Sequence, residues 1–127
     1  MCLYSLVTFQ DQAEHSGELF LSLNYQPSAR RLAVVVLKAR NVPKMDISGF
    51  SDPYVKIYLS RGEERLVKKK THIKKRSLNP VFNESFVFEL PGRDGSLGDL
   101  QLEFVMCDWD RITKNEVGGI NCFKDSD

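Results

Sequence analysis

Apolar residues recur at every second position in several short runs of this sequence. That period is typical of half-buried β-strands, whereas an amphipathic helix repeats about every 3.6 residues. The segment 31–40 (RLAVVVLKAR) is apolar on both faces in its middle, as expected for a central strand. The alternating runs lie at residues 19–25, 55–59, 82–90 and 100–106.

Turn-forming residues separate these runs. Pro, Gly, Asn, Asp and Ser gather between them, at residues 26–28, 46–49, 79–80 and 91–96. At least five strands follow one another without a convincing amphipathic helix. The pattern therefore predicts an all-β fold, an antiparallel sandwich or barrel.

Length and composition fit one globular domain. The chain has 127 residues, 42% of them hydrophobic and 28% charged. It contains no apolar run of the roughly 18 residues that span a bilayer, and residues 1–10 lack the features of a signal peptide. The odd number of cysteines (Cys2, Cys107 and Cys122) favours reduced thiols over a disulfide framework.

The motifs of common enzymes are absent. The two histidines lie at positions 15 and 72, and the sequence has no nucleophile elbow, phosphate loop or HExxH motif. We therefore expect a binding module that is not itself an enzyme. Such a module inside a larger lipid-modifying enzyme stays open at this point.

Charge is segregated along the chain, although the formal net charge is only +1. Residues 61–76 hold eight Lys/Arg and two Glu, whereas the chain from residue 77 onward holds ten Asp/Glu and four Lys/Arg. Two surfaces of opposite charge are therefore expected.

Acidic residues stand at the ends of predicted strands. Asp46 and Asp52 bracket a turn before one strand, Asp108 and Asp110 follow another, and Glu116 comes six residues later. Loops from different parts of a sandwich can meet at one end, and Ca²⁺ takes six to eight oxygen ligands in flexible geometry. For any one of these aspartates, a simple turn-forming role is at least as good an explanation.

Several motifs in order resemble the C2 domain family, in particular the synaptotagmin type and its second C2 domain. They are MDISGFSDPYVK (45–56), KKKTHIKK (68–75), SLNPVFNE (77–84) and CDWDRITKNEVG (107–118). The segment 17–25 (GELFLSLNY) matches the opening strand of the synaptotagmin type, particularly of its second C2 domain, and the likeness runs over residues 17–119. The resemblance implies a Greek-key β-sandwich of seven to eight strands. It also implies a module that binds anionic phospholipid in a calcium-dependent way during vesicle trafficking or exocytosis, at the cytoplasmic face of membranes or vesicles.

The resemblance also implies roles for single residues. Two or more Ca²⁺ ions would be held by the carboxylates of Asp46, Asp52, Asp108, Asp110 and Glu116, with the backbone carbonyls of Met45 and Trp109. Ile47 and Ile112, at the loop tips, would enter the bilayer, which would account for two exposed apolar side chains.

A basic strand is expected at residues 68–76, with alternate side chains on opposite faces. Its cations suggest a polyanionic partner. The resemblance points to phosphatidylinositol bisphosphate or acidic SNARE proteins, bound by Lys68, Lys69, Lys70, Lys74 and Lys75. Alternatively, the lysines guard an edge strand against aggregation. Nucleic acid is not expected, because no aromatic residues interleave with the lysines.

The two ends of the chain depart from the family pattern. Residues 1–16 form an N-terminal appendage, 17–120 the C2 domain and 121–127 a divergent tail where the family adds a further strand. We expect 2–9 (CLYSLVTF) to pair beside 19–25 and to replace that strand; self-association through an exposed sheet edge is the alternative. The competing function is a calcium-independent protein-interaction module that uses the basic strand alone.

Overall fold

The computed structural model describes residues 2–10, 16–42, 51–91, 100–109 and 115–123. Most of these residues lie in strands, and the one short helix among them is the 3₁₀ turn η1 (Pro27–Ala29). The strands are β1 (Cys2–Gln10), β2 (Ser16–Gln26), β3 (Arg31–Arg40), β4 (Pro53–Arg61), β5 (Glu64–Lys70), β6 (Val81–Glu89), β7 (Leu100–Asp108) and β8 (Asn115–Phe123). No helix in the described part of the chain is long and apolar enough to cross a membrane.

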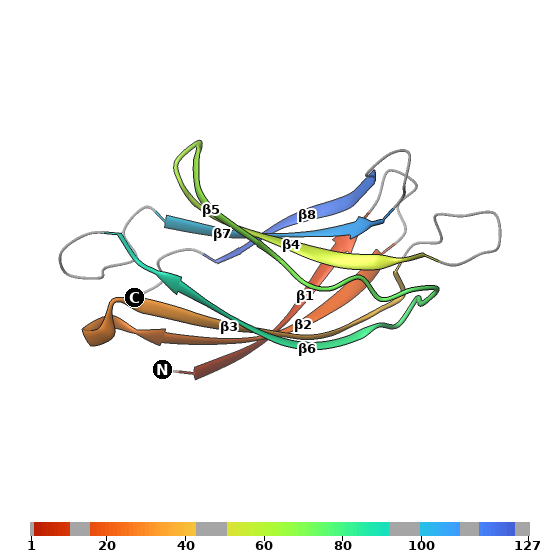
Figure 1. The fold of residues 1–127 in the computed structure, drawn as a ribbon, viewed down its shortest axis with the longest axis horizontal. Coiled ribbons are helices and arrows are strands. Elements are labelled where there is room, and N and C mark those ends of the chain that lie inside the picture. Colours follow the sequence, from red (N-terminus) through yellow and green to blue (C-terminus); the bar gives the residue numbers. More distant parts are fainter. Residues whose placement is uncertain (1, 11–15, 43–50, 92–99, 110–114, 124–127) are drawn as a thin grey trace.

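Two four-stranded sheets face each other (Figure 1). The first has the order β1-β2-β3-β6 and the second the order β5-β4-β7-β8, and every neighbouring pair is antiparallel. This confirms the expected all-β antiparallel sandwich.

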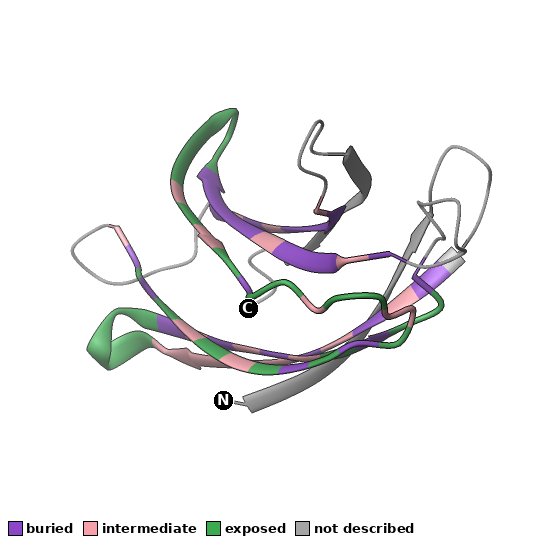
Figure 2. Ribbon diagram, turned by 45° about the vertical axis from the view of Figure 1, so that its right-hand side comes forward, coloured by how far each residue is buried: buried purple, intermediate pink, exposed green. Residues whose placement is uncertain are grey.

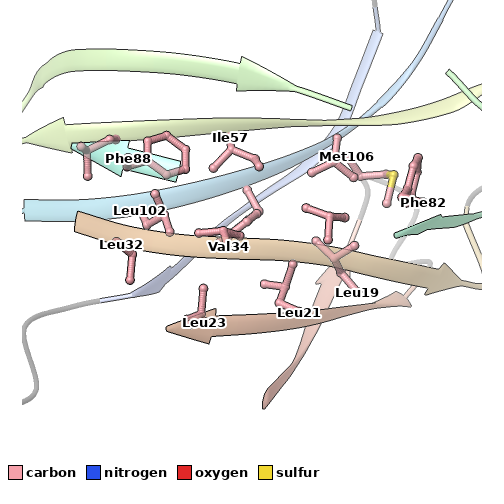
Figure 3. Close-up of a cluster of buried hydrophobic side chains, with 14 of the residues drawn as sticks. Leu19, Leu21, Leu23, Leu32, Val34, Ile57, Phe82, Phe88, Leu102 and Met106 are labelled. Carbon is pink, nitrogen blue, oxygen red and sulfur yellow. The ribbon is translucent and has the colours of Figure 1, made fainter. Parts of the chain in front are cut away.

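The core fills the space between the sheets, and it comes from the alternating runs of the sequence. Leu21, Val34, Ile57 and Leu102 are each fully buried, and they meet with other apolar side chains of both sheets (Figure 3). Each such side chain contributes about 1.5–3 kcal/mol by leaving water. Because successive side chains of a strand point to opposite faces, the period of two in the sequence fixes which face is inside.

Strand β3 is central, as its two apolar faces predicted. It lies between β2 and β6, and Leu32, Val34 and Val36 point into the core. The residues between them are half-buried on the outer face. Figure 2 shows the contrast with β5 and the segment after it, which are mostly exposed.

The N-terminal segment joins the first sheet. β1 pairs with β2 from Cys2 opposite Asn24 to Gln10 opposite Ser16, without a shift in register. This is the pairing that the sequence favoured for residues 2–9. The further idea, that β1 replaces a strand that the family places elsewhere, stays a prediction.

Backbone hydrogen bonds bring the connections after β3, β5 and β7 to one end of the sandwich. Val42 N–H donates to the Leu78 carbonyl at 3.0 Å, and Ser77 N–H donates to the Ser51 carbonyl at 2.8 Å. The turn η1 lies at the opposite end, where Leu90 N–H donates to the Arg30 carbonyl at 2.9 Å. We call the first of these the loop end.

Candidate functional site

Asp52 and Asp108 meet at the loop end, although 56 positions separate them in the sequence. β4 and β7 pair so that Pro53 stands opposite Asp108, which brings the start of one strand beside the end of the other. The Asp52 N–H donates to Asp108 Oδ1 at 2.7 Å, and the Trp109 N–H donates to the Asp52 carbonyl at 2.9 Å. The Asp108 side chain is buried and that of Asp52 is partly buried.

The segment between β5 and β6 is attached to the same point. Arg76 N–H donates to Asp52 Oδ1 at 2.7 Å, with the Arg76 backbone in the left-handed region at φ 51°. Ser77 N–H bonds the neighbouring Ser51 carbonyl. Asp52 therefore connects three chain segments: its own, the end of β7 and the segment before β6.

Glu116 lies in a strand, whereas the sequence placed it in a loop. It is the second residue of β8, and its Cα stands opposite that of Cys107. The backbone there pairs with β7 from Asn115 onward. The Glu116 backbone is therefore at the loop end, next to the Asp108 position, while its side chain lies outside the described part.

The other predicted calcium and membrane residues are outside the described residues. Met45, Asp46 and Ile47 fall in 43–50, and Asp110 and Ile112 fall in 110–114. Within the described residues, no group of three or more His, Cys, Asp or Glu is placed to hold a metal ion. The roles of those five residues stay predictions.

The donors that are described fit a hard cation. Asp52 and Asp108 supply carboxylate oxygens, the ligand type that Ca²⁺ prefers. The Oδ1 atom of each accepts one backbone N–H, and a carboxylate has about four lone-pair sites in all. The nearby thiol of Cys107 is buried and directed at the Val105 carbonyl, at 3.7 Å. The described oxygens therefore suit calcium better than zinc.

Trp109 packs away from this point. It lies against a small apolar cluster that is separate from the main core. The members of that cluster are Tyr54, Tyr58, Val105 and Cys107, which lie on the outer face of the second sheet. The tryptophan thus holds the end of β7 in place, while its backbone N–H donates to the Asp52 carbonyl.

The basic residues of β5 divide between two faces. Lys68 pairs with Tyr58 and Lys70 with Lys56, and the side chains of Lys68 and Lys70 are exposed on the outer face. Lys56 belongs to this basic face but was missed from the sequence. Its position in β4 could have suggested the outer face, but only the register with β5 brings it opposite Lys70.

Lys69 points the other way. It pairs with Ile57, and its Nζ lies 5.4 Å from the centroid of the Phe88 ring on β6. A cation over an aromatic face is attracted by the ring quadrupole, and the stem of the side chain can cover apolar surface. Lys69 therefore contributes to the contact between the sheets, whereas Lys68, Lys70 and Lys56 form the outer basic face.

The expected strand over 68–76 is too long, because β5 ends at Lys70. The Thr71 side chain explains the end: its Oγ1 accepts the Val55 N–H at 2.9 Å and donates to the His72 carbonyl at 3.1 Å. Such side-chain bonds replace the regular ladder. The alternation of faces stops there, and Lys74 and Lys75 lie in the connection to β6, with Lys74 N–H bonded to the Pro53 carbonyl.

Glu84 fixes the same connection to the first sheet. Its carboxylate accepts the His72 N–H at 3.0 and 3.2 Å and contacts the His72 ring at Nδ1 at 3.0 Å. The connection between β5 and β6 is therefore held on both sheets. Backbone N–H groups of this connection donate to the carbonyls of Pro53 and Ser51, at the start of β4 in the second sheet. Glu84, on β6, holds the connection to the first sheet.

Three comparisons with known proteins extend this picture. The C2 domain family model matches residues 30–125. Mouse (Mus musculus) synaptotagmin-11 is 58% identical over 104 residues, which cover 81% of this chain and 24% of the relative. Human (Homo sapiens) synaptotagmin-4 is 52% identical over 103 residues, with the same 81% and 24% covered. The chain thus spans about a quarter of the length of these relatives.

A solved structure agrees with the fold. The RIM C2A domain from Drosophila superimposes with a TM-score of 0.68 at 25% sequence identity, covering 82% of each chain. The likeness to this neighbour and the identities with the synaptotagmins support the same family.

Proposed function

The chain belongs to the C2 domain family, in its synaptotagmin-like part, and on that premise we propose that it is a calcium-dependent phospholipid-binding module. The observation that carries the proposal is the meeting of Asp52 and Asp108 at the end where three connections converge. Such modules act as membrane-docking domains and not as enzymes.

Asp52 and Asp108 would form the inner part of the calcium site. The carboxylates of Asp46, Asp110 and Glu116 and the backbone carbonyls of Met45 and Trp109 would complete the coordination of two or more ions. Bound Ca²⁺ would neutralise these carboxylates and offer coordination positions to lipid phosphate. Without it, the acidic end repels an anionic bilayer.

Ile47 and Ile112 would supply the apolar part of docking. They follow β3 and β7 in the sequence, in segments outside the described residues. Each CH₂ group that enters the hydrocarbon region contributes about 0.8 kcal/mol.

The outer basic face of β4 and β5 would bind phosphatidylinositol bisphosphate. Lys68 and Lys70 are exposed there, with Lys56 opposite Lys70. Anionic lipid attracts such residues by about 1 kcal/mol each near the surface. Lys74 and Lys75 extend this surface toward the loop end, and acidic SNARE proteins are the proteins that fit it. We place the module at the cytoplasmic face of membranes or vesicles, in vesicle trafficking or exocytosis.

A second function rests on the same basic face alone. β5 is an edge strand, so its lysines can face a partner without any contribution from the loop end. In that case the chain would be a calcium-independent protein-interaction module. The edge position equally suits lysines that only protect the strand from aggregation.

Lipid and calcium measurements on matched variants separate these functions. Calorimetry should detect Ca²⁺ binding, and sedimentation with phosphatidylserine liposomes should require Ca²⁺ and be reversed by EGTA. The double variant Asp52→Asn with Asp108→Asn should lose both Ca²⁺ binding and the calcium-dependent binding to liposomes. Absence of Ca²⁺ binding would favour the calcium-independent function. Liposomes with phosphatidylinositol bisphosphate should then still bind, and Lys68→Ala with Lys70→Ala should remove that binding.

A further inference from the structure

The two sheets have four outer edges: β1 and β6 in the first sheet, β5 and β8 in the second. An edge strand has unpaired backbone N–H and C=O groups that can pair with another chain. Proteins commonly protect such edges with lysines, prolines, bulges or a covering segment. The four edges of this chain differ in how far they are protected.

Three of the edges carry such a feature. β5 has the exposed side chains of Lys68 and Lys70. β6 is interrupted by a register shift against β3, near Asn83 with its φ of 49°. β8 pairs with β7 through two register shifts, so its backbone is irregular. Each of these features disfavours regular pairing with a further strand.

β1 has no lysine, proline or bulge, although β8 contacts it. Its nine residues, CLYSLVTFQ, include no charged residue, no proline and no glycine. Aromatic and β-branched residues, which favour strands, make up four of them. It pairs with β2 over its whole length without a bulge, which makes its backbone regular up to the edge. β8 also contacts β1, and Figure 1 shows the N-terminal part of β1 leading away from it.

We propose that β1 pairs with β1 of a second copy of this chain, antiparallel and about a two-fold axis. A two-fold pairing with full overlap places Leu6 opposite Leu6 and Cys2 opposite Gln10. No like charges meet in this pairing, because the strand is uncharged. The backbone N–H and C=O groups at the β1 edges of both copies are hydrogen-bonded in one contact. The contact is closed, so it yields a dimer and not a fibre. The two sheets β1-β2-β3-β6 become one continuous sheet.

A second copy fits this edge better than a charged peptide does. The edge offers no charged residue to pair with a basic or acidic partner. Backbone hydrogen bonds supply the affinity in strand addition, and the side-chain positions supply the specificity. In this strand those positions are apolar or uncharged, and they match themselves under the two-fold axis.

Analytical ultracentrifugation with EGTA present tests the dimer without any calcium or lipid. The unaltered chain should shift from monomer to dimer between about 10 μM and 1 mM. Leu6→Lys should raise the dissociation constant about tenfold or more, because like charges then stand opposite each other. Leu6→Glu should do the same, and a mixture of the two variants should dimerise again.

Ser85→Lys is the matched control. Ser85 is exposed on the other edge strand of the same sheet, so the same gain of charge there should leave the dimer unchanged. Hydrogen exchange needs no substitution: amides of β1 should become protected as concentration rises, while those of β6 should not. The proposal is overturned by a monomer at all concentrations, by a folded Leu6→Lys variant that dimerises normally, or by β1 protection that is independent of concentration.

Discussion

The Asp52 N–H donates to Asp108 Oδ1 at 2.7 Å, so the backbone just before β4 is bonded to the side chain of the last residue of β7. A carboxylate proposed as a ligand is thus also a structural hydrogen-bond acceptor. The two roles depend on different properties of the side chain. The negative charge would attract the cation, whereas the acceptor oxygen holds the Asp52 N–H and so stabilises the fold.

Asp108→Asn separates these two roles. The amide keeps an acceptor oxygen for the Asp52 N–H but removes the charge, so the free energy of unfolding without calcium should change by less than about 1 kcal/mol. Asp108→Ala leaves a partly buried N–H unpaired and should cost about 1–3 kcal/mol. Both variants should lose calcium binding. Thermal melting in EGTA and calorimetry with Ca²⁺ give the two readings, and equal melting temperatures for Asn and Ala would contradict the structural role.

Thr71→Val should destabilise the domain. The Thr71 side chain is 4% exposed, and its Oγ1 accepts the Val55 N–H, which valine cannot do. The loss should be about 1–3 kcal/mol, and each kcal/mol lowers the melting temperature by about 3–5 °C in a domain of this size. Thr71→Ser keeps the hydroxyl and serves as the control, with a smaller loss. A Val variant as stable as the Ser variant would show that the bond is replaced by another.

Lys56→Ala should weaken binding to liposomes that contain phosphatidylinositol bisphosphate as much as Lys70→Ala does. The two residues are cross-strand neighbours on the outer face, and each should contribute about 1 kcal/mol, or about a fivefold change in affinity. Lys69→Ala should weaken it less, because Lys69 lies over Phe88 on the other face. Arg31→Ala, at the far end of the sandwich, is the control. Equal losses for Lys69 and Lys70 would contradict two separate faces.

Deletion of residues 1–12 should lower the melting temperature sharply. It removes the pairing along β1 and exposes the edge of β2, where Leu19 and Leu21 enter the core. Melting should be recorded at low protein concentration, so that self-association contributes little. An unchanged melting curve would show that β1 adds nothing to the stability of the sandwich.

The strands could be predicted well from the sequence, because every second side chain of each strand has to be apolar to be buried in the core. Leu19, Val34 and Ile57 must all face inside, and a shift by one residue would expose each of them. The end of β5 was missed for the opposite reason. Thr71 looks like any strand residue in the sequence, and only its bond to Val55 N–H shows that the ladder stops there.

The candidate site was predictable in part. Asp52 and Asp108 stand at strand ends in the sequence, and the structure brings them together. Lys56 could not be assigned to the basic face, because a pairing between strands depends on the register and not on the local pattern. Glu116 was grouped with the acidic loop residues because it follows Asp108 and Asp110 closely in the sequence, but its pairing with β7 places it in a strand.

The antiparallel pairing of β1 with β2 gives a way to measure how the molecule is oriented on a bilayer. Cys2 stands opposite Asn24, at the end that carries η1, and Gly17 stands toward the loop end. The strand between these two ends is about 25 Å long. A fluorophore on Cys2, with Cys122→Ser and with Cys107 buried, would therefore report its distance from the headgroups. An upright molecule holds the dye a strand length from the headgroups, whereas one that lies on its basic face holds it nearer, because β1 belongs to the sheet stacked about 10 Å above that face.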